Sequence, residues 1–252
     1  MDLGLKGKVA LVTGGARDIG REISRTLAAE GATVAVNYAH AKAEAEATVT
    51  GIRQRGGDAA AYPADVADHA AVTRMVNDVV AAHGRIDVLV NNAGFLESRL
   101  FLETRPEEWT RQIDVGLYGV LNCCHVAAPR MVEQKAGRII NIVGDSARVG
   151  QPRLAITAAS RGAVIALGKT LAKELGRAGV TVNTLALGYV ETAHSDQKWL
   201  AANRDKILAF YPIRRLGRAS DVAPFVAYLS SQHAAWVTGQ TISVSGGYAT
   251  VG

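Results

Sequence analysis

Short apolar runs alternate along the chain with longer segments in which apolar residues recur every three or four positions. Short runs are typical of buried strands, and the longer segments are typical of amphipathic helices. Residues 8–13 (KVALVT) are an example of the first kind, and residues 18–30, with Ile19, Ile23 and Leu27 four apart, are an example of the second. Strands that alternate with helices of this length predict an α/β fold, in which helices cover both faces of a parallel sheet.

The alternation continues to the end of the chain. No repeat, low-complexity stretch or linker interrupts the 252 residues, so a single domain spanning residues 1–252 is expected. Residues 193–216 break the rhythm and are predicted to form a flap that covers a substrate. Strands are predicted at 8–13, 33–36, 59–62, 88–91, 138–143, 180–185 and 240–244, and helices at 18–30, 41–55, 70–82, 107–134, 155–177, 196–210 and 220–230.

Composition excludes several classes of protein. The chain is 48% hydrophobic and carries a formal charge of +5, but its basic residues are scattered. This pattern favours a solvated basic surface that attracts anionic small molecules over a nucleic-acid interface. No apolar run reaches the length of a membrane span. The two cysteines, Cys123 and Cys124, are adjacent, which suits neither a disulfide nor a metal site, and the first residues lack the apolar core of a signal peptide. A cytoplasmic protein is therefore expected, without a metal, a membrane or a nucleic acid as partner.

A glycine-rich segment, TGGARDIG at residues 13–20, lies between the first predicted strand and the first predicted helix. Glycines let the backbone approach a pyrophosphate closely, and a helix N-terminus supplies N–H donors and a positive dipole. The segment therefore predicts nucleotide binding, or descent from a nucleotide-binding protein, on a Rossmann-type doubly wound sheet.

Further motifs follow in order: ADV at 64–66, NNAG at 91–94, VN at 182–183, GYVET at 188–192, PIRRLG at 212–217 and the segment 239–247. Together with the glycine-rich segment, they resemble the classical short-chain dehydrogenase/reductase family over nearly the whole chain. The resemblance implies a seven-stranded parallel sheet of order 3-2-1-4-5-6-7, and NAD or NADP as the cofactor. By the same resemblance the cofactor-binding residues are Gly14, Arg17, Asp18, Ile19, Asn37, Asp65, Val66, Asn92, Ala93, Gly94, Gly188, Val190 and Thr192.

Asp18 stands where the family's loop has its middle glycine. If ionised, its carboxylate would repel a pyrophosphate by roughly a few kcal/mol at an effective dielectric constant near 20. Asp is also a favoured N-cap, so the residue is alternatively expected to cap the first helix. The affinity for NAD or NADP is accordingly expected to be weakened or lost.

The end of the second predicted strand bears on the choice of cofactor. A residue that reads the ribose 2′-hydroxyl of NAD would be an Asp or a Glu there. This chain has the neutral Asn37, with Arg17 nearby in the glycine-rich loop. If a dinucleotide binds, NADP is therefore favoured over NAD.

The four groups that perform the family's chemistry are missing. The family's Tyr and Lys, in the spacing YxxxK, correspond here to Thr157 and Arg161. Its Ser, thirteen residues before the Tyr, corresponds to Gly144, and its Asn, seven residues after Trp109, corresponds to Gly116. A Thr hydroxyl is not an acid near neutral pH, and losing a positioned acid or base typically costs roughly 10²–10⁴-fold in rate.

Two nearby residues are candidates to compensate. Asp145 and Ser146 lie just beyond the lost Ser, and Asp145 is a possible substitute acid/base, although a polar loop pair of no catalytic role is the simpler interpretation. His125, beside the two cysteines on a long predicted helix, is interpreted as an interface or core residue.

Three functions remain open. The first is a non-catalytic subunit that supports an active partner of the same family. Such a complex would be a homo- or hetero-tetramer packed through the two long helices, and the segments 146–150 and 243–247 resemble members that oxidise hydroxyacyl-CoA thioesters, as in anaerobic aromatic degradation. The second is an active NAD(P)-dependent oxidoreductase with substitute catalytic residues, and the third is a nucleotide-sensing binding protein. Fold alone does not decide among them.

Overall fold

The computed structural model describes residues 1–251 and contains one seven-stranded sheet of order β3-β2-β1-β4-β5-β6-β7, with all neighbouring strands parallel. The fold class and strand order are therefore as expected. The strands are β1 (Val9–Val12), β2 (Thr33–Tyr38), β3 (Asp58–Pro63), β4 (Val88–Asn91), β5 (Gly137–Gly144), β6 (Val180–Leu187) and β7 (Thr241–Val244).

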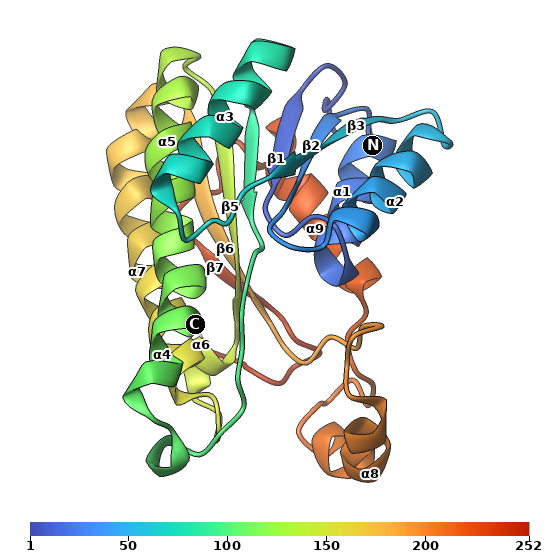
Figure 1. Ribbon diagram of the computed structural model, residues 1–252, viewed down its shortest axis with the longest axis vertical. Coiled ribbons are helices and arrows are strands. Elements are labelled where there is room, and N and C mark those ends of the chain that lie inside the picture. The colour runs from blue at the N-terminus through green and yellow to red at the C-terminus, as the bar shows by residue number, and fades with distance from the viewer. Residues whose placement is uncertain (252) are drawn as a thin grey trace.

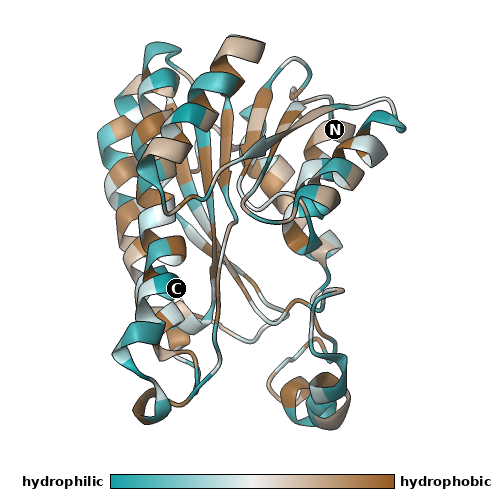
Figure 2. Cartoon of the chain, in the orientation of Figure 1, coloured by the Kyte–Doolittle hydropathy of each residue, from teal (hydrophilic) through white to brown (hydrophobic). Residues whose placement is uncertain are grey.

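Two layers of helices enclose the sheet (Figure 1). One layer contains α1 (Asp18–Ala29), α2 (Lys42–Arg53) and α9 (Ala219–Ser230), and the other contains α3 (His69–His83), α5 (Gly119–Glu133) and α7 (Ala155–Leu175). Each layer packs on its own face of the sheet in a separate hydrophobic core, and Figure 2 shows mostly apolar strands between helices that carry both polar and apolar residues. The remaining helices are α4 (Pro106–Ile113), α6 (Ser146–Val149) and α8 (Gln197–Leu208).

The prediction of one continuous helix at 107–134 is wrong. The chain forms α4, then a π-helical turn at Asp114–Tyr118, and then α5. Gly119, the first residue of α5, packs against Val66, which follows β3. An added Cβ at residue 119 would come within 2.6 Å of Val66 Cγ2, so the two segments approach closely there. Such π-turns are frequent at functional sites. The periodicity of apolar residues continues through the turn, which is why it predicts one helix.

The predicted flap contains α8, which Figure 1 shows apart from the two helical layers, near the edge where the strands end. A bridge between Val190, which follows β6, and Gly217 joins the two ends of the flap. Within residues 1–251, no helix combines the length and the apolar character needed to cross a bilayer.

A buried carboxylate joins the amino-terminal edges of β1 and β4. Asp87, 5% exposed, accepts hydrogen bonds from Arg85 Nε at 2.7 Å and from Val9 N at 3.0 Å, and lies 3.3 Å from Lys8 Nζ. Burial works to raise the pKa of this carboxyl, but the hydrogen bonds and the two cations outweigh it, so its pKa lies below the usual value.

We expect Asp87→Asn to lower the free energy of unfolding by about 1–3 kcal/mol at pH 7, the usual worth of hydrogen bonds to a charged group. Because the native pKa is depressed, this contribution is complete above about pH 4 and disappears as the pH falls through the native pKa. Urea titrations at several pH values measure it. The control is Glu46→Gln, since that carboxylate, 61% exposed beside Lys42, contributes little. Equal losses in both variants would contradict the prediction.

Candidate functional site

The glycine-rich loop has the geometry of a phosphate cradle at the carboxyl end of β1. Gly14 has a φ of +58°, which favours glycine. A Cβ on Gly20 would overlap the Gly14 carbonyl oxygen and come within 2.6 Å of Asn92 Nδ2. Asn92 fixes the loop by donating from Nδ2 to the carbonyl oxygens of Thr13 at 3.0 Å and Gly14 at 3.1 Å. The loop therefore keeps the close backbone approach that a dinucleotide needs.

The same cradle is tied to the turn after β4. Thr13 Oγ1 accepts hydrogen bonds from the backbone N–H groups of Asn92 and Ala93, each at 3.0 Å. Predicted cofactor residues from two separate segments are thus brought together at one edge of the sheet. This edge, beyond the carboxyl ends of parallel strands, is where open α/β sheets bind their ligands.

Asn37 has a structural role instead of the predicted position beside the ribose. Its side chain is 1% exposed, donates to the carbonyl oxygens of Tyr62 at 3.2 Å and Ala64 at 3.0 Å, and accepts from Gly14 N at 3.2 Å. The predicted strand ended two residues too early, since β2 runs to Tyr38. The residues at the rim are consequently Tyr38, Ala39 and His40, none of them acidic.

Asp18 is the first residue of α1, and the expectation that it caps this helix is wrong. The N-cap is Arg17, and no side chain caps the helix. Asp18 has a φ of +50°, a conformation that suits the glycine of related loops and that Asp tolerates better than most residues. Its carboxylate lies 2.9 Å from Nδ1 of His194, in the flap. Sequence separation concealed this pair, and no motif points to it.

Asp65, the residue expected to receive the adenine amino group, is already partly engaged. Its carboxylate accepts from Ala67 N at 3.0 Å and from Arg111 Nη1 at 2.9 Å. Partial burial works to raise the pKa of this carboxyl, but the backbone donor and the arginine outweigh it, so the pKa is lowered. The adjacent Val66 is buried in the core. Arg111 was not among the expected residues, because only the tertiary fold brings α4 to this point.

Arg161, in the position of the family's lysine, is a buried cation. It is 9% exposed and donates to the carbonyl oxygens of Ala93 at 3.0 Å and Ile142 at 3.2 Å. Burial lowers the pKa of its guanidinium to about 10, so the group is charged at neutral pH. Gly94 makes room for it, since a Cβ there would come within 2.5 Å of Arg161 Nη2. A positive charge is thus held where β4 and β5 end.

A hydroxyl lies next to the vacant serine position. Ser146 Oγ is 3.1 Å from the point where a residue at 144 would carry its Cβ, and Ser146 is 8% exposed. Within the described part of the chain, this hydroxyl makes no hydrogen bond of its own.

The asparagine position, Gly116, lies in the π-helical turn. A Cβ there would come within 2.7 Å of Ser160 Oγ and 3.9 Å of Arg161 Nε. Thr157, one helical turn before Arg161 on α7, is partly exposed. Gly116 therefore lies beside Arg161, and Gly144 lies beside Ser146, although none of the four tetrad positions carries the family's side chain.

Asp145, the predicted substitute acid/base, is enclosed by protein. It is 1% exposed, and its Oδ1 accepts a 2.6 Å hydrogen bond from Ser243 Oγ, which in turn accepts from Arg148 Nη1 at 2.7 Å. A carboxylate in this position does not reach a substrate. His125 is exposed and lies 3.3 Å from the Nε2 of His69, so it is not a core residue.

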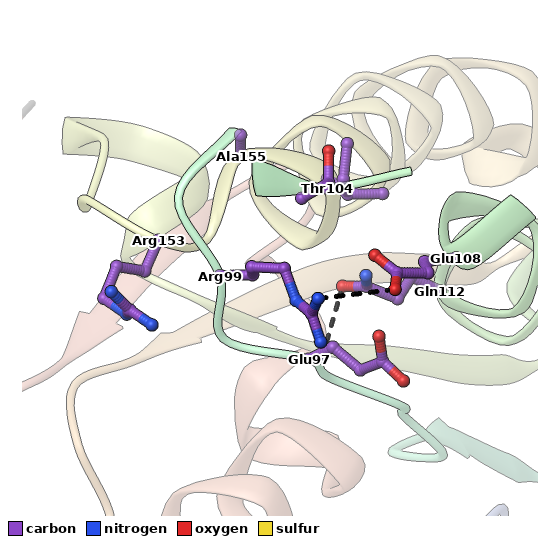
Figure 3. Close-up of a pocket in the computed structure, with 8 residues that line it drawn as sticks. Glu97, Arg99, Thr104, Glu108, Gln112, Arg153 and Ala155 are labelled. Atoms are coloured by element: carbon purple, nitrogen blue, oxygen red, sulfur yellow. Dashed lines mark hydrogen bonds and ion pairs between the residues drawn. The ribbon is translucent and has the colours of Figure 1, made fainter. Parts of the chain in front are cut away.

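The mouth of the site is lined by a loop after β4. A small cavity of about 10 Å³ lies beside it, room for about one water, and Arg99 Nη1 lies 3.5 Å from Glu108 Oε1 across it (Figure 3). The residues around the cavity hold the loop against α4 and α7. The cavity itself is too small for a ligand. The loop and the flap both expose large apolar side chains, namely Phe95, Leu96, Leu100, Phe101 and Leu102 on the loop and Trp199, Phe210 and Ile213 on the flap.

The segment just before the flap, residues 188–192, contains residues expected to hold the nicotinamide end of the cofactor. Gly188 N donates to Val244 O, and Val190 forms the bridge to Gly217. Thr192 N donates to Ser195 Oγ at 3.0 Å, which turns the chain toward His194. No cluster of three or more metal-binding side chains occurs within residues 1–251.

Comparisons with known proteins identify relatives over nearly the whole chain. A family model described as enoyl-(acyl carrier protein) reductase matches residues 14–249. The 3-oxoacyl-(acyl-carrier-protein) reductase FabG of Staphylococcus aureus is 43% identical over 244 residues, covering 95% of this chain and 97% of that protein. A 3-oxoacyl-(acyl-carrier-protein) reductase of Synechocystis is 41% identical over 244 residues, covering 96% and 97%.

Among solved structures, a gluconate 5-dehydrogenase from Burkholderia cenocepacia J2315 in complex with NADP and tartrate superposes with a TM-score of 0.93. It is 32% identical, and the match covers 100% of this chain and 98% of that one. The names of these relatives favour an active oxidoreductase over a non-catalytic subunit, and none of them refers to aromatic degradation or to a CoA thioester.

Proposed function

Because the chain belongs to the short-chain dehydrogenase/reductase family, we propose that it is an NADP(H)-dependent oxidoreductase that interconverts a ketone and a secondary alcohol on a 3-oxoacyl thioester. The names of the Staphylococcus and Synechocystis relatives support this substrate class, and the Burkholderia structure supports the cofactor. The apolar side chains on the loop and the flap suit an acyl chain between them.

The observation that carries the proposal is the intact cradle of the glycine-rich loop. Gly14, Gly20 and Asn92 retain the close backbone approach, and only the Asp18 carboxylate opposes a diphosphate. Arg17 beside the cradle and the lack of an acidic residue at Tyr38–His40 support NADP over NAD.

The bound dinucleotide would supply the hydride to the carbonyl carbon of the substrate. The chain's own residues then have to stabilise the negative charge that develops on the carbonyl oxygen. Ser146 Oγ, beside the vacant serine position, is the group we propose as hydrogen-bond donor, and the buried Arg161 adds a positive field. Because Thr157 is not acidic near neutral pH, the proton comes from water.

Replacing this donor gives the first test. We expect Ser146→Ala to lower kcat for reduction of a 3-oxoacyl thioester by about 10²-fold, as does loss of an oxyanion donor, with the dissociation constant of NADPH unchanged. Loss of NADPH absorbance measures turnover, and fluorescence titration measures binding. Thr157→Ala is the matched control and is expected to keep kcat within about twofold, since it removes a hydroxyl without a proposed role. Equal rates in Ser146→Ala and the parent protein would exclude Ser146.

A second function is favoured by the four vacant tetrad positions. A subunit that binds NADPH without turning it over, in a homo- or hetero-tetramer with an intact relative, would retain the cradle and the two long helices. Purified chain that binds NADPH but reduces no thioester would support that function over the oxidoreductase. A chain with no affinity for NADPH would exclude both.

A further inference from the structure

The flap and the glycine-rich loop are joined by one side-chain pair. His194 Nδ1 lies 2.9 Å from the Asp18 carboxylate, although 176 positions separate the two residues. The Asp18 side chain is 21% exposed and the His194 side chain 51% exposed, so both groups remain accessible to solvent at the rim.

Asp18 lies where the diphosphate of a dinucleotide would bind, so its charge affects cofactor binding. The carboxylate is carried by the first residue of α1, next to the N–H groups that would receive the diphosphate of a dinucleotide. An unpaired carboxylate there repels the ligand, whereas a carboxylate paired with an imidazolium presents little net charge. The protonation state of His194 therefore decides how anionic the cradle is.

We propose that His194 is a positioning residue for the cofactor: as an imidazolium it neutralises Asp18 and admits the diphosphate of NADP(H) to the loop. Deprotonation leaves the carboxylate unpaired and weakens binding. This inference rests on the proposed use of a dinucleotide and adds a pH-dependent residue from the flap to its binding site. Because imidazole is the side chain whose charge changes across the physiological pH range, we expect the affinity for the dinucleotide to fall as the pH rises.

Two carboxylates on the adjoining segments already have partners of their own. Glu191 is paired with Arg204 at 2.7 Å, and Asp196 accepts from Trp199 N at 2.9 Å as the N-cap of α8. Arg17, Arg21, Glu22 and Lys198 are further charged residues of these segments, and the structure records no side-chain partner for them within residues 1–251.

Binding of NADPH, NADH and adenosine 2′-monophosphate to the full chain, measured by calorimetry at pH 5.5 and 8, tests the inference. The monophosphate lacks the diphosphate but shares the titrating 2′-phosphate with NADPH, and NADH lacks the 2′-phosphate. We expect Asp18→Asn, which preserves shape, to tighten NADPH and NADH about tenfold or more at pH 8, while the monophosphate binds unchanged.

His194→Ala is expected to weaken both dinucleotides about tenfold at pH 5.5 and to remove most of the pH dependence of NADH binding. His233→Ala, far away on the surface, is the control and should leave every constant unchanged. The inference is overturned if the dissociation constants of NADPH and NADH are the same for the parent protein, Asp18→Asn and His194→Ala at both pH values. The proposed cofactor would still stand in that case. If no dinucleotide binds any variant, the proposed function itself is overturned.

Discussion

Reinstating the family's acid is expected to raise turnover of a 3-oxoacyl thioester by about 10²–10⁴-fold, the usual contribution of a positioned general acid. The variant combines Thr157→Tyr, Arg161→Lys and Gly144→Ser. The scaffold supports it because Arg161, at the position of the family's lysine, already lies at the carboxyl ends of β4 and β5. The pKa of a phenol is near 10 and is lowered by a neighbouring lysine, whereas a threonine hydroxyl is not an acid in this range.

The packing shows what must accompany these changes. A Cβ at 144 would lie 3.1 Å from Ser146 Oγ, so Ser146→Ala is added to make room for the new serine. Gly116 is left unchanged, because a Cβ there would come within 2.7 Å of Ser160 Oγ.

The control carries Thr157→Phe in the same background, which supplies the bulk of the ring without its hydroxyl. Stopped-flow loss of NADPH absorbance measures both proteins. Equal gains with Phe and Tyr, or no gain in a variant that still binds NADPH, would contradict the prediction. A gain limited to Tyr would show that the phenol hydroxyl supplies the added turnover.

The periodicity of apolar residues was sufficient to predict the positions and approximate bounds of the strands along the chain, because the central strands β1, β4 and β6 are buried along their whole length and read as short apolar runs. It was not sufficient for the π-helical turn at Asp114–Tyr118, since the apolar spacing continues across it. Local hydrogen bonding, which changes the number of residues per turn, leaves little trace in such a pattern.

The site was predictable where motifs fix the backbone and unpredictable where tertiary contacts decide. Gly14 and Asn92 lie together as expected, because their motifs end neighbouring strands. Asn37 and Asp145 are polar residues at the correct strand ends, but both are enclosed by hydrogen bonds within the protein. His194 meets Asp18 only because the flap folds back, which no local pattern encodes.

The cradle of the glycine-rich loop depends on one position more than on any other in it. We expect Gly20→Ala to lower the affinity for NADPH at least about tenfold and the free energy of unfolding by about 1–3 kcal/mol, the usual cost of overpacking. Gly20 lies in the first turn of α1, and an added methyl group would overlap the Gly14 carbonyl oxygen and come within 2.6 Å of Asn92 Nδ2. The backbone of the loop has to move, and the hydrogen bond from Asn92 to Gly14 breaks with it.

Gly51→Ala is the matched control, since it makes the same change inside α2, where a Cβ would meet only Arg25 Nη2 at 3.6 Å. There the higher helix propensity of Ala predicts stabilisation by about 0.5–1 kcal/mol and unchanged NADPH binding. Urea titration and calorimetry measure both variants. A Gly20→Ala protein that binds NADPH as tightly as Gly51→Ala does would mean that the close approach at residue 20 serves helix packing alone. The diphosphate would then have to be held by groups other than the N–H donors of this loop.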